Sequence, residues 1–467
     1  MSETPLHFKT IGEIATLLES KQLSPVDLSR TMLERIDALD ARLMSYATVM
    51  AESAMAQART AEQEIASGHY RGPLHGVPVA VKDLCYTRGV RTMGGAKVYR
   101  DFVPDFDATV VVRLAEAGAV ILGKLNLTEG AMGGYHPDLA IPKNPWNVDR
   151  WAGASSSGSG VATAAGLCFG SLGSDTGGSI RFPASACGTV GLKPTYGRVS
   201  RYGVHALGQS LDHIGPLTRS SADAGIVLQA IAGRDPNDPT TLPDQVPDML
   251  EAIEQGVNGL RIGWNEGYAC SGVDPQVVRG VRDGLKVMES LGARIVEIEL
   301  PDIDPYLPYW RTLCTAEAVV AHEASYPSRR EDYGPYFQEW LDRGAAVTGA
   351  EYARATFMRN ECNGIFRTAL QDIDVLACPT TISAAYPVTE EALYGPVNNG
   401  RAVQFQRFTV PFDFNGAPTI SVPCGLNSEG LPLSLQFVGK HLSEPLLCRI
   451  GHAFEQATDW HNLHPPV

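Results

Sequence analysis

The sequence predicts one large α/β unit, and two observations lead to this prediction. Short β-branched runs alternate with amphipathic helical segments along most of the chain. No linker rich in Pro, Ser or Gly, no charge block and no repeat divides the 467 residues. Length alone would suggest two or three domains, but the pattern favours one unit. Its expected parts are an N-terminal helical layer (1–70), a core that carries the chemistry (71–220) and the remaining sheet and helices (221–467).

The first seventy residues are predicted to form helices. Thr10 and Glu13, three positions apart, have the pattern of a capping box at the start of a helix. Ser24-Pro25 is typical of a second helix start. Apolar residues then recur at helical spacing and predict one buried stripe: Leu28, Met32, Ile36 and Leu39.

From Gly76 onward the pattern changes to strands that alternate with helices. Residues 77–81 and 119–122 are short apolar runs typical of strands, and residues 107–117 have helical spacing between them. The alternation recurs with a strand over 260–263, a helix that begins at Asp274-Pro275 and a strand over 294–300.

Composition excludes several classes of protein. A hydrophobic fraction of 44% with 19% charged residues is typical of a globular protein rather than a disordered one. The net charge of −14 argues against a nucleic-acid or membrane-surface binder, because such proteins cluster Lys and Arg. Nine cysteines without a CxxC pair, no metal-ligand spacing, no signal peptide and no apolar run of membrane length predict a cytoplasmic protein without metal or cofactor.

Three segments carry residue types that packing does not readily explain. The first is Pro78–Lys82, an apolar strand that ends in a lysine. Loss of hydration lowers the pKa of a lysine, so Lys82 could act as a base near neutral pH. The ordinary alternative is a lysine whose head group reaches water or pairs with Asp83.

The second segment is the serine-glycine run at 153–160, followed by the small apolar residues 161–166. In isolation such a run resembles a flexible linker. Because the residues that follow have the pattern of a tightly packed helix, we expect the hydroxyls of the run to be ordered at a helix start. A phosphate-binding loop would need a lysine where Ser159 stands.

The third segment is 173–183, in which two glycines precede Ser179. Glycines allow successive backbone N–H groups to converge beside a serine hydroxyl, where they could stabilise an oxyanion. The alternative is a simple Gly-Gly turn. A GxSxG elbow is absent, and a lysine can replace histidine as the base of a serine nucleophile.

Together these segments resemble the three signature segments of the amidase signature family. Further matches cover most of the chain, and residues 300–370 and 383–405 match least. The further matching segments are Gly123–Asn126 with Glu129, Asn144–Trp146, Gly191–Arg198, Ser210–Pro216, Asp374–Thr380 and Asn415–Pro423. The resemblance implies an α/β/α layered fold with a central mixed sheet flanked by helices. It also makes His213, which follows Asp212, a structural residue rather than a member of a triad.

The resemblance further implies a Ser-cisSer-Lys triad that forms an acyl-enzyme. Ser179 would be the nucleophile, Ser155 the relay after a cis peptide bond, and Lys82 the base. The oxyanion would be held by the N–H groups of Thr176, Gly177, Gly178 and Ser179. This chain reads GASSSGS where the family usually has GGSSGGS, so Ser156 is the alternative relay. Asp175 and Arg181 match family positions, with either a functional role or a structural ion pair.

The substrate is less well defined by the sequence. By resemblance, Ala131, Met132 and Gly133 could line an acyl pocket for a neutral group, or could simply be core. Linear carboxamides are the first expectation, and carbamates (urethanes) or ureas the next. The 394–406 segment, with Asn398, Asn399 and Arg401, is either a rim loop that selects substrate or a surface loop.

Two other functions compete with a free-standing hydrolase. One is the glutaminase-type A subunit of a tRNA-dependent amidotransferase. Against it, an EVKRRI-like segment is missing before Asp374, and Gln406 occupies the position of an expected substrate-binding aspartate. The other is a non-catalytic scaffold, which the joint presence of Lys82, Ser155 and Ser179 disfavours. The expected partner is a small amide or carbamate substrate, and a homodimer is left open.

Overall fold

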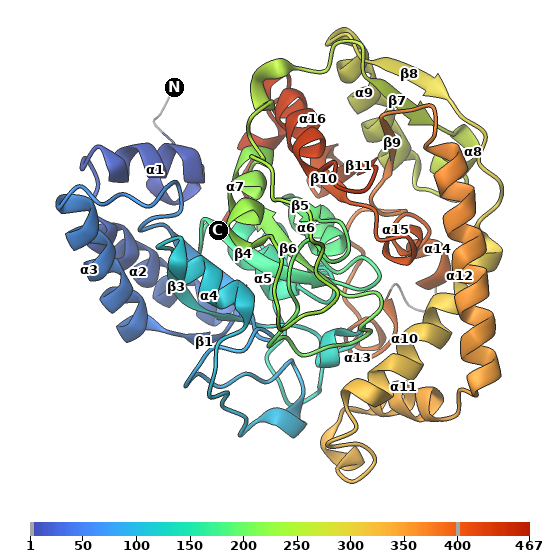
Figure 1. Ribbon diagram of the computed structural model, residues 1–467, viewed down its shortest axis with the longest axis horizontal. Helices are drawn as coiled ribbons and strands as arrows, with labels where there is room; N and C mark the ends of the chain where they lie inside the picture. Colours follow the sequence, from blue (N-terminus) through green and yellow to red (C-terminus); the bar gives the residue numbers. More distant parts are fainter. Residues whose placement is uncertain (1–3, 398–401) are drawn as a thin grey trace.

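The protein is built on one long mixed β-sheet. The computed structural model describes residues 4–397 and 402–467 (Figure 1), and in these residues the sheet has 11 strands. In chain order they are β1 (Tyr46–Val49), β2 (Pro78–Lys82), β3 (Val120–Leu125), β4 (Gly170–Asp175), β5 (Val190–Lys193), β6 (His213–Thr218), β7 (Arg261–Trp264), β8 (Arg294–Glu297), β9 (Val375–Pro379), β10 (Thr419–Leu426) and β11 (Pro432–Gly439).

The strand order is β1-β3-β2-β4-β6-β5-β10-β11-β9-β7-β8. The β2–β3, β2–β4, β7–β8 and β7–β9 pairs are parallel, and the pairs at the centre of the sheet are antiparallel. Since one sheet joins residues 46–439, the mixed α/β architecture predicted from the resemblance is confirmed.

Helices flank this sheet. They are α1 (Ile11–Glu19), α2 (Pro25–Leu43), α3 (Ala51–Ala66), α4 (Thr109–Glu116), α5 (Ser157–Ala164), α6 (Arg181–Cys187), α7 (Ser221–Ile231), α8 (Glu266–Cys270), α9 (Pro275–Ser290), α10 (Pro308–Ala321), α11 (Pro335–Ala345), α12 (Gly349–Ala369), α13 (Glu390–Tyr394), α14 (Ala402–Phe405), α15 (Val410–Phe414) and α16 (Glu444–Gln456). Figure 1 shows α1–α3 at one end of the molecule and α10–α12 at the other.

The N-terminal segment follows the sequence pattern with one exception. Thr10 and Glu13 form the predicted capping box, and the Ser24 hydroxyl caps α2. The expectation that residues 1–70 are helical is wrong for Tyr46–Val49, which form β1 and pair antiparallel with β3. A four-residue edge strand is too short to show a period in the sequence.

The later elements lie within a few residues of their predicted bounds. The 294–300 strand is shorter than expected and ends at Glu297. Its neighbour β7 also ends early, at Trp264, whose carbonyl accepts from the Ile298 N–H at 2.9 Å, so β7 offers no strand residue to pair with 299–300.

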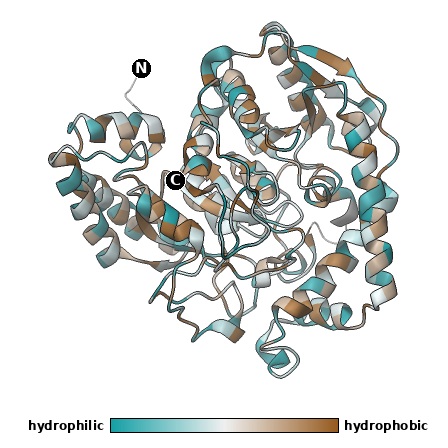
Figure 2. Ribbon diagram, in the orientation of Figure 1, coloured by the Kyte–Doolittle hydropathy of each residue, from teal (hydrophilic) through white to brown (hydrophobic). Residues whose placement is uncertain are grey.

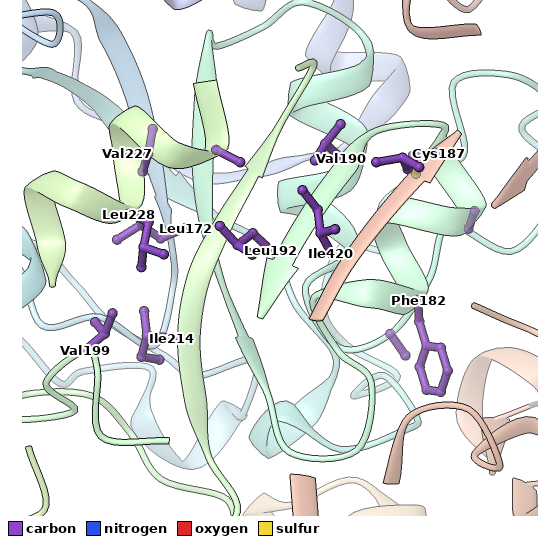
Figure 3. Close-up of a cluster of buried hydrophobic side chains, with 14 of the residues drawn as sticks. Leu172, Phe182, Cys187, Val190, Leu192, Val199, Ile214, Val227, Leu228 and Ile420 are labelled. Atoms are coloured by element: carbon purple, nitrogen blue, oxygen red, sulfur yellow. The ribbon is translucent and has the colours of Figure 1, made fainter. Parts of the chain in front are cut away.

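Apolar side chains fill the space between the sheet and its helices. Figure 2 shows hydrophobic colour along the inner elements and hydrophilic colour on the outer helices. Figure 3 shows Leu172, Leu192 and Ile214 of neighbouring strands near Val227 and Leu228 of α7, with Phe182 and Cys187 of α6 beside β10. All of these side chains are buried. The β4–α6 connection, which contains Ser179, therefore begins and ends in rigid core.

The nine cysteines are free, and all except Cys270 are buried. In the described ranges, no helix is long and apolar enough to cross a membrane.

Candidate active site

Lys82 is the last residue of β2, and its side chain is completely buried. Its Nζ lies 2.6 Å from Ser155 Oγ, 2.8 Å from Ser174 Oγ and 2.9 Å from Ser156 Oγ. Burial lowers the pKa of Lys82 to about 7, although Cys85, Asp175 and Asp212 act in the opposite direction. A neutral amine has one lone pair and two N–H groups, so Lys82 can accept one hydroxyl proton while it donates to the other two oxygens.

Ser155 and Ser156 differ in what their hydroxyls do. The Ala154–Ser155 peptide bond is cis, as the resemblance implied, and α5 starts two residues later. Ser156 Oγ donates to the Ser174 carbonyl at 3.2 Å and accepts from the Ser174 N–H at 3.2 Å. The Ser156 proton is therefore committed to the backbone of β4. The Ser155 hydroxyl contacts Lys82 Nζ.

Ser179 lies on the short connection between β4 and α6, and its side chain is half-buried, whereas Lys82 and Ser155 are buried. The connection is shaped by Asp175, whose carboxylate accepts from the N–H groups of Gly178 (2.6 Å) and Ile180 (3.0 Å). The Gly178 N–H thus points toward Asp175. Of the four predicted oxyanion donors, the N–H groups of Thr176, Gly177 and Ser179 remain free of this carboxylate.

Arg181 joins Asp175 to a distant part of the chain. Its Nη2 lies 2.8 Å from Asp175 Oδ1 and 2.8 Å from Asp413 Oδ2, and all three side chains are fully buried. Burial raises the pKa of Asp413 well above its usual range. Burial also opposes ionisation of Asp175, but the Arg181 guanidinium outweighs it and holds the pKa of that carboxyl below its usual value. We interpret this cluster as a structural support beneath the Ser179 connection.

His213 is also part of this support. It is buried on β6, where Nδ1 lies 3.2 Å from the Asp175 carbonyl oxygen and 3.7 Å from Asp413 Oδ1. Burial lowers its pKa well below the usual value. This position favours the structural role that was expected for His213.

The predicted acyl-pocket residues lie on the loop after β3. A Cβ at Gly133 would come 3.4 Å from Val397 Cγ2 and 3.5 Å from Tyr336 Cε1. Ala131 lines a cavity of about 40 Å³ together with Ser174, Arg201 and Asp212. The Glu129 carboxylate accepts from the Gly334 N–H with both oxygens at 3.0 Å, which ties this loop to the start of α11. Asn398, Asn399 and Arg401 of the predicted rim loop lie outside the described residues.

Sequence reasoning missed four residues that shape the site: Ser174, Trp310, Tyr336 and Asp413. Ser174 stands in the third signature segment, and the alternation of side chains along β4 could have placed it beside Lys82. The other three come from segments that are far from the signature motifs in sequence, and they carry no motif of their own.

A buried lysine hydrogen-bonded to three serine hydroxyls, on a mixed α/β sheet, is the arrangement of a hydrolase of the serine-lysine class. A family model described as Amidase matches residues 27–448, and the chain therefore belongs to the amidase family, in its amidase signature group. A protein of Mycobacterium tuberculosis named "putative amidase AmiD" is 44% identical over 98% of this chain and 96% of its own length.

Two further relatives represent other activities on the same fold. The A subunit of glutamyl-tRNA(Gln) amidotransferase from Moorella thermoacetica is 40% identical over 99% of each chain. The solved structure of peptide amidase from Stenotrophomonas maltophilia has a TM-score of 0.85 with 31% identity, over 98% of each chain.

Proposed function

We propose that this amidase-family hydrolase cleaves linear carboxamides of neutral, apolar acyl groups through Ser179, Ser155 and Lys82. The observation that carries the proposal is the Lys82 Nζ to Ser155 Oγ distance of 2.6 Å, in a site where burial lowers the pKa of Lys82 to about 7. At neutral pH a large share of this lysine is then uncharged and can accept a proton.

The proposed reaction has two stages. Ser179 Oγ attacks the carbonyl carbon while its proton passes to Ser155, and the Ser155 proton passes to Lys82. The backbone N–H groups beside Ser179 hold the oxyanion. The proton then returns through Ser155 to the leaving nitrogen as the C–N bond breaks. Water attacks the acyl-enzyme by the same proton route and releases the carboxylic acid.

The preference for an apolar acyl group rests on the surroundings of Gly133. Tyr336 of α11 and Val397 lie next to it, and Met132 is half-buried beside it. These three side chains carry no charge and can bury an alkyl or aryl group. Two relatives, AmiD and the S. maltophilia peptide amidase, carry amidase names, which supports a carboxamide over a carbamate or a urea.

A glutaminase role in a tRNA-dependent amidotransferase is the second candidate, because of the 40% identity to the Moorella amidotransferase chain. The buried Gln406 stands where an aspartate would be expected to hold glutamine. A neutral amide cannot replace the charge of that aspartate. This difference favours the free-standing hydrolase.

The experiment is a hydrolysis panel with the full chain alone. It compares acetamide, butyramide, benzamide, glutamine, ethyl carbamate, phenylurea and matched esters, with ammonia or alcohol release measured for wild type and Ser179→Ala. We expect wild-type turnover to be fastest with butyramide or benzamide and to vanish in the variant. Preferential turnover of glutamine would favour the amidotransferase function, and wild-type silence on every compound would overturn the proposal.

A further inference from the structure

Residues 176–179, whose N–H groups are the predicted oxyanion donors, form what we call the oxyanion loop. A residue from the part of the chain where the family resemblance is weakest contacts this loop. Trp310, in the first turn of α10, is buried and donates its Nε1–H to the Thr176 carbonyl oxygen at 2.8 Å. Its ring also covers Gly177, where an added Cβ would lie 2.8 Å from Trp310 Cζ2. One side chain thus fixes the carbonyl of residue 176 and limits residue 177 to glycine.

The direction of this hydrogen bond determines where the next N–H points. In a trans peptide the carbonyl and the following N–H point in opposite directions. Because the Thr176 carbonyl faces Trp310, the Gly177 N–H faces away from the indole. The next peptide is held in a different way: Thr409 Oγ1 donates to the Gly177 carbonyl at 2.7 Å, and the Gly178 N–H donates to Asp175. The Gly177 N–H lies in the plane of the 176–177 peptide, which Trp310 holds, and the next peptide is held by Thr409 and Asp175.

We propose that Trp310 is a positioning residue that orients the 176–177 peptide so that the Gly177 N–H serves the oxyanion. This inference rests on the proposed function. The Thr176 side chain is held separately, since its hydroxyl donates to Asp212 Oδ1 at 2.5 Å. The Trp310 ring lies beside that of Trp340 of α11, with ring centroids 5.9 Å apart.

The test compares two buried tryptophans that differ in one hydrogen bond. Trp310→Phe keeps an aromatic ring against Gly177 but removes the N–H. Trp340→Phe is the matched control, because within the described part of the chain the Trp340 Nε1 is buried without a hydrogen-bond partner. Both variants lose the same atoms from the same aromatic pair, so packing losses should be similar.

The readouts are kcat and KM for the best amide of the panel, and the inhibition constant of phenylboronic acid, which forms a tetrahedral adduct with a serine. We expect Trp310→Phe to lower kcat by about 10- to 100-fold, as for the partial loss of an oxyanion donor. Its KM should change less than threefold, and the phenylboronic acid constant should rise in proportion to the loss in kcat. Trp340→Phe should change all three values less than threefold.

Equal effects of the two variants, or a loss confined to KM, would overturn the inference. If Trp310→Phe unfolds at the assay temperature, benzothienylalanine at position 310 replaces it, since sulfur then substitutes for the N–H in a ring of the same shape. Failure of the proposed function is seen separately, as an inactive wild type or an active Ser179→Ala variant.

Discussion

Two regions of the molecule form the candidate site, and they do so in different ways. The 71–220 segment contains Lys82, Ser155 and Ser179, the residues of the proposed triad. The α10–α12 layer supplies the Trp310 indole, which contacts the oxyanion loop at Thr176. It also supplies the Gly334 N–H, which contacts Glu129 in the loop after β3 that carries Ala131, Met132 and Gly133, here called the acyl loop. The proposed chemistry is thus concentrated in short motifs, whereas part of the positioning comes from a layer without motifs. Variants in the two regions should therefore differ in how much, and in which way, they change kcat and KM.

The largest expected effect is the loss of the nucleophile. Ser179→Ala removes the atom that forms the acyl-enzyme, and we expect kcat to fall by about 10⁴-fold or more, as for the nucleophiles of other serine hydrolases. Steady-state hydrolysis of the best amide measures it, with thermal unfolding as the control for folding. Residual activity above about a tenth of wild type would contradict the assignment.

Replacement of Ser155 and replacement of Ser156 should lower kcat by different factors, both smaller than the factor for Ser179. Ser155→Ala breaks the proposed proton path, and we expect kcat to fall by about 10²- to 10⁴-fold. Ser156→Ala removes a hydroxyl whose proton is committed to the Ser174 carbonyl, so we expect a loss of about tenfold and a lower melting temperature. The same assay ranks both variants, and a reversed order would make Ser156 the relay.

The pH dependence tests the ionisation of the base. Lys82 acts when it is neutral, so kcat/KM should rise about tenfold per pH unit below pH 7 and level off above it, as burial lowers the pKa of Lys82 to about 7. Burial also lowers the pKa of Lys193 to about 7, but that ammonium donates to the carbonyls of Ala417 and Pro194 rather than to a serine. A profile that is flat from pH 5 to pH 9 would contradict the role of Lys82.

The smallest expected effect concerns the acyl loop, where the two regions meet. A methyl group at Gly133 would touch Val397 and Tyr336 at ordinary contact distances. We therefore expect Gly133→Ala to raise KM for benzamide about two- to fivefold and to leave KM for acetamide within twofold. Equal changes for both substrates would place Gly133 outside the acyl pocket.

The proposed triad rests on patterns that are local in the sequence. A strand that ends in Lys82, a serine run before α5 and two glycines before Ser179 each have a pattern within a few residues. The capping box of Thr10 and Glu13 is local for the same reason. These patterns required no knowledge of long-range contacts.

The remainder could not be predicted because it depends on topology. Asp413 reaches Arg181 only because β10 lies beside β5 in the sheet, next to the helix that carries Arg181. Trp310 reaches Thr176 across 134 residues of sequence, and Tyr336 meets Gly133 through the packing of α11. The strand β1 could not be predicted from alternating apolar and polar residues, since an edge strand of four residues is too short to show that alternation.

The most direct test of the account is the site and pH dependence of labelling by a serine-directed fluorophosphonate, followed by peptide mapping. We predict that the label is on Ser179, that it is lost in Ser179→Ala, and that its rate rises through pH 7 in wild type but not in Lys82→Met. Labelling at another serine, or an unchanged pH profile without Lys82, would contradict the proposed triad.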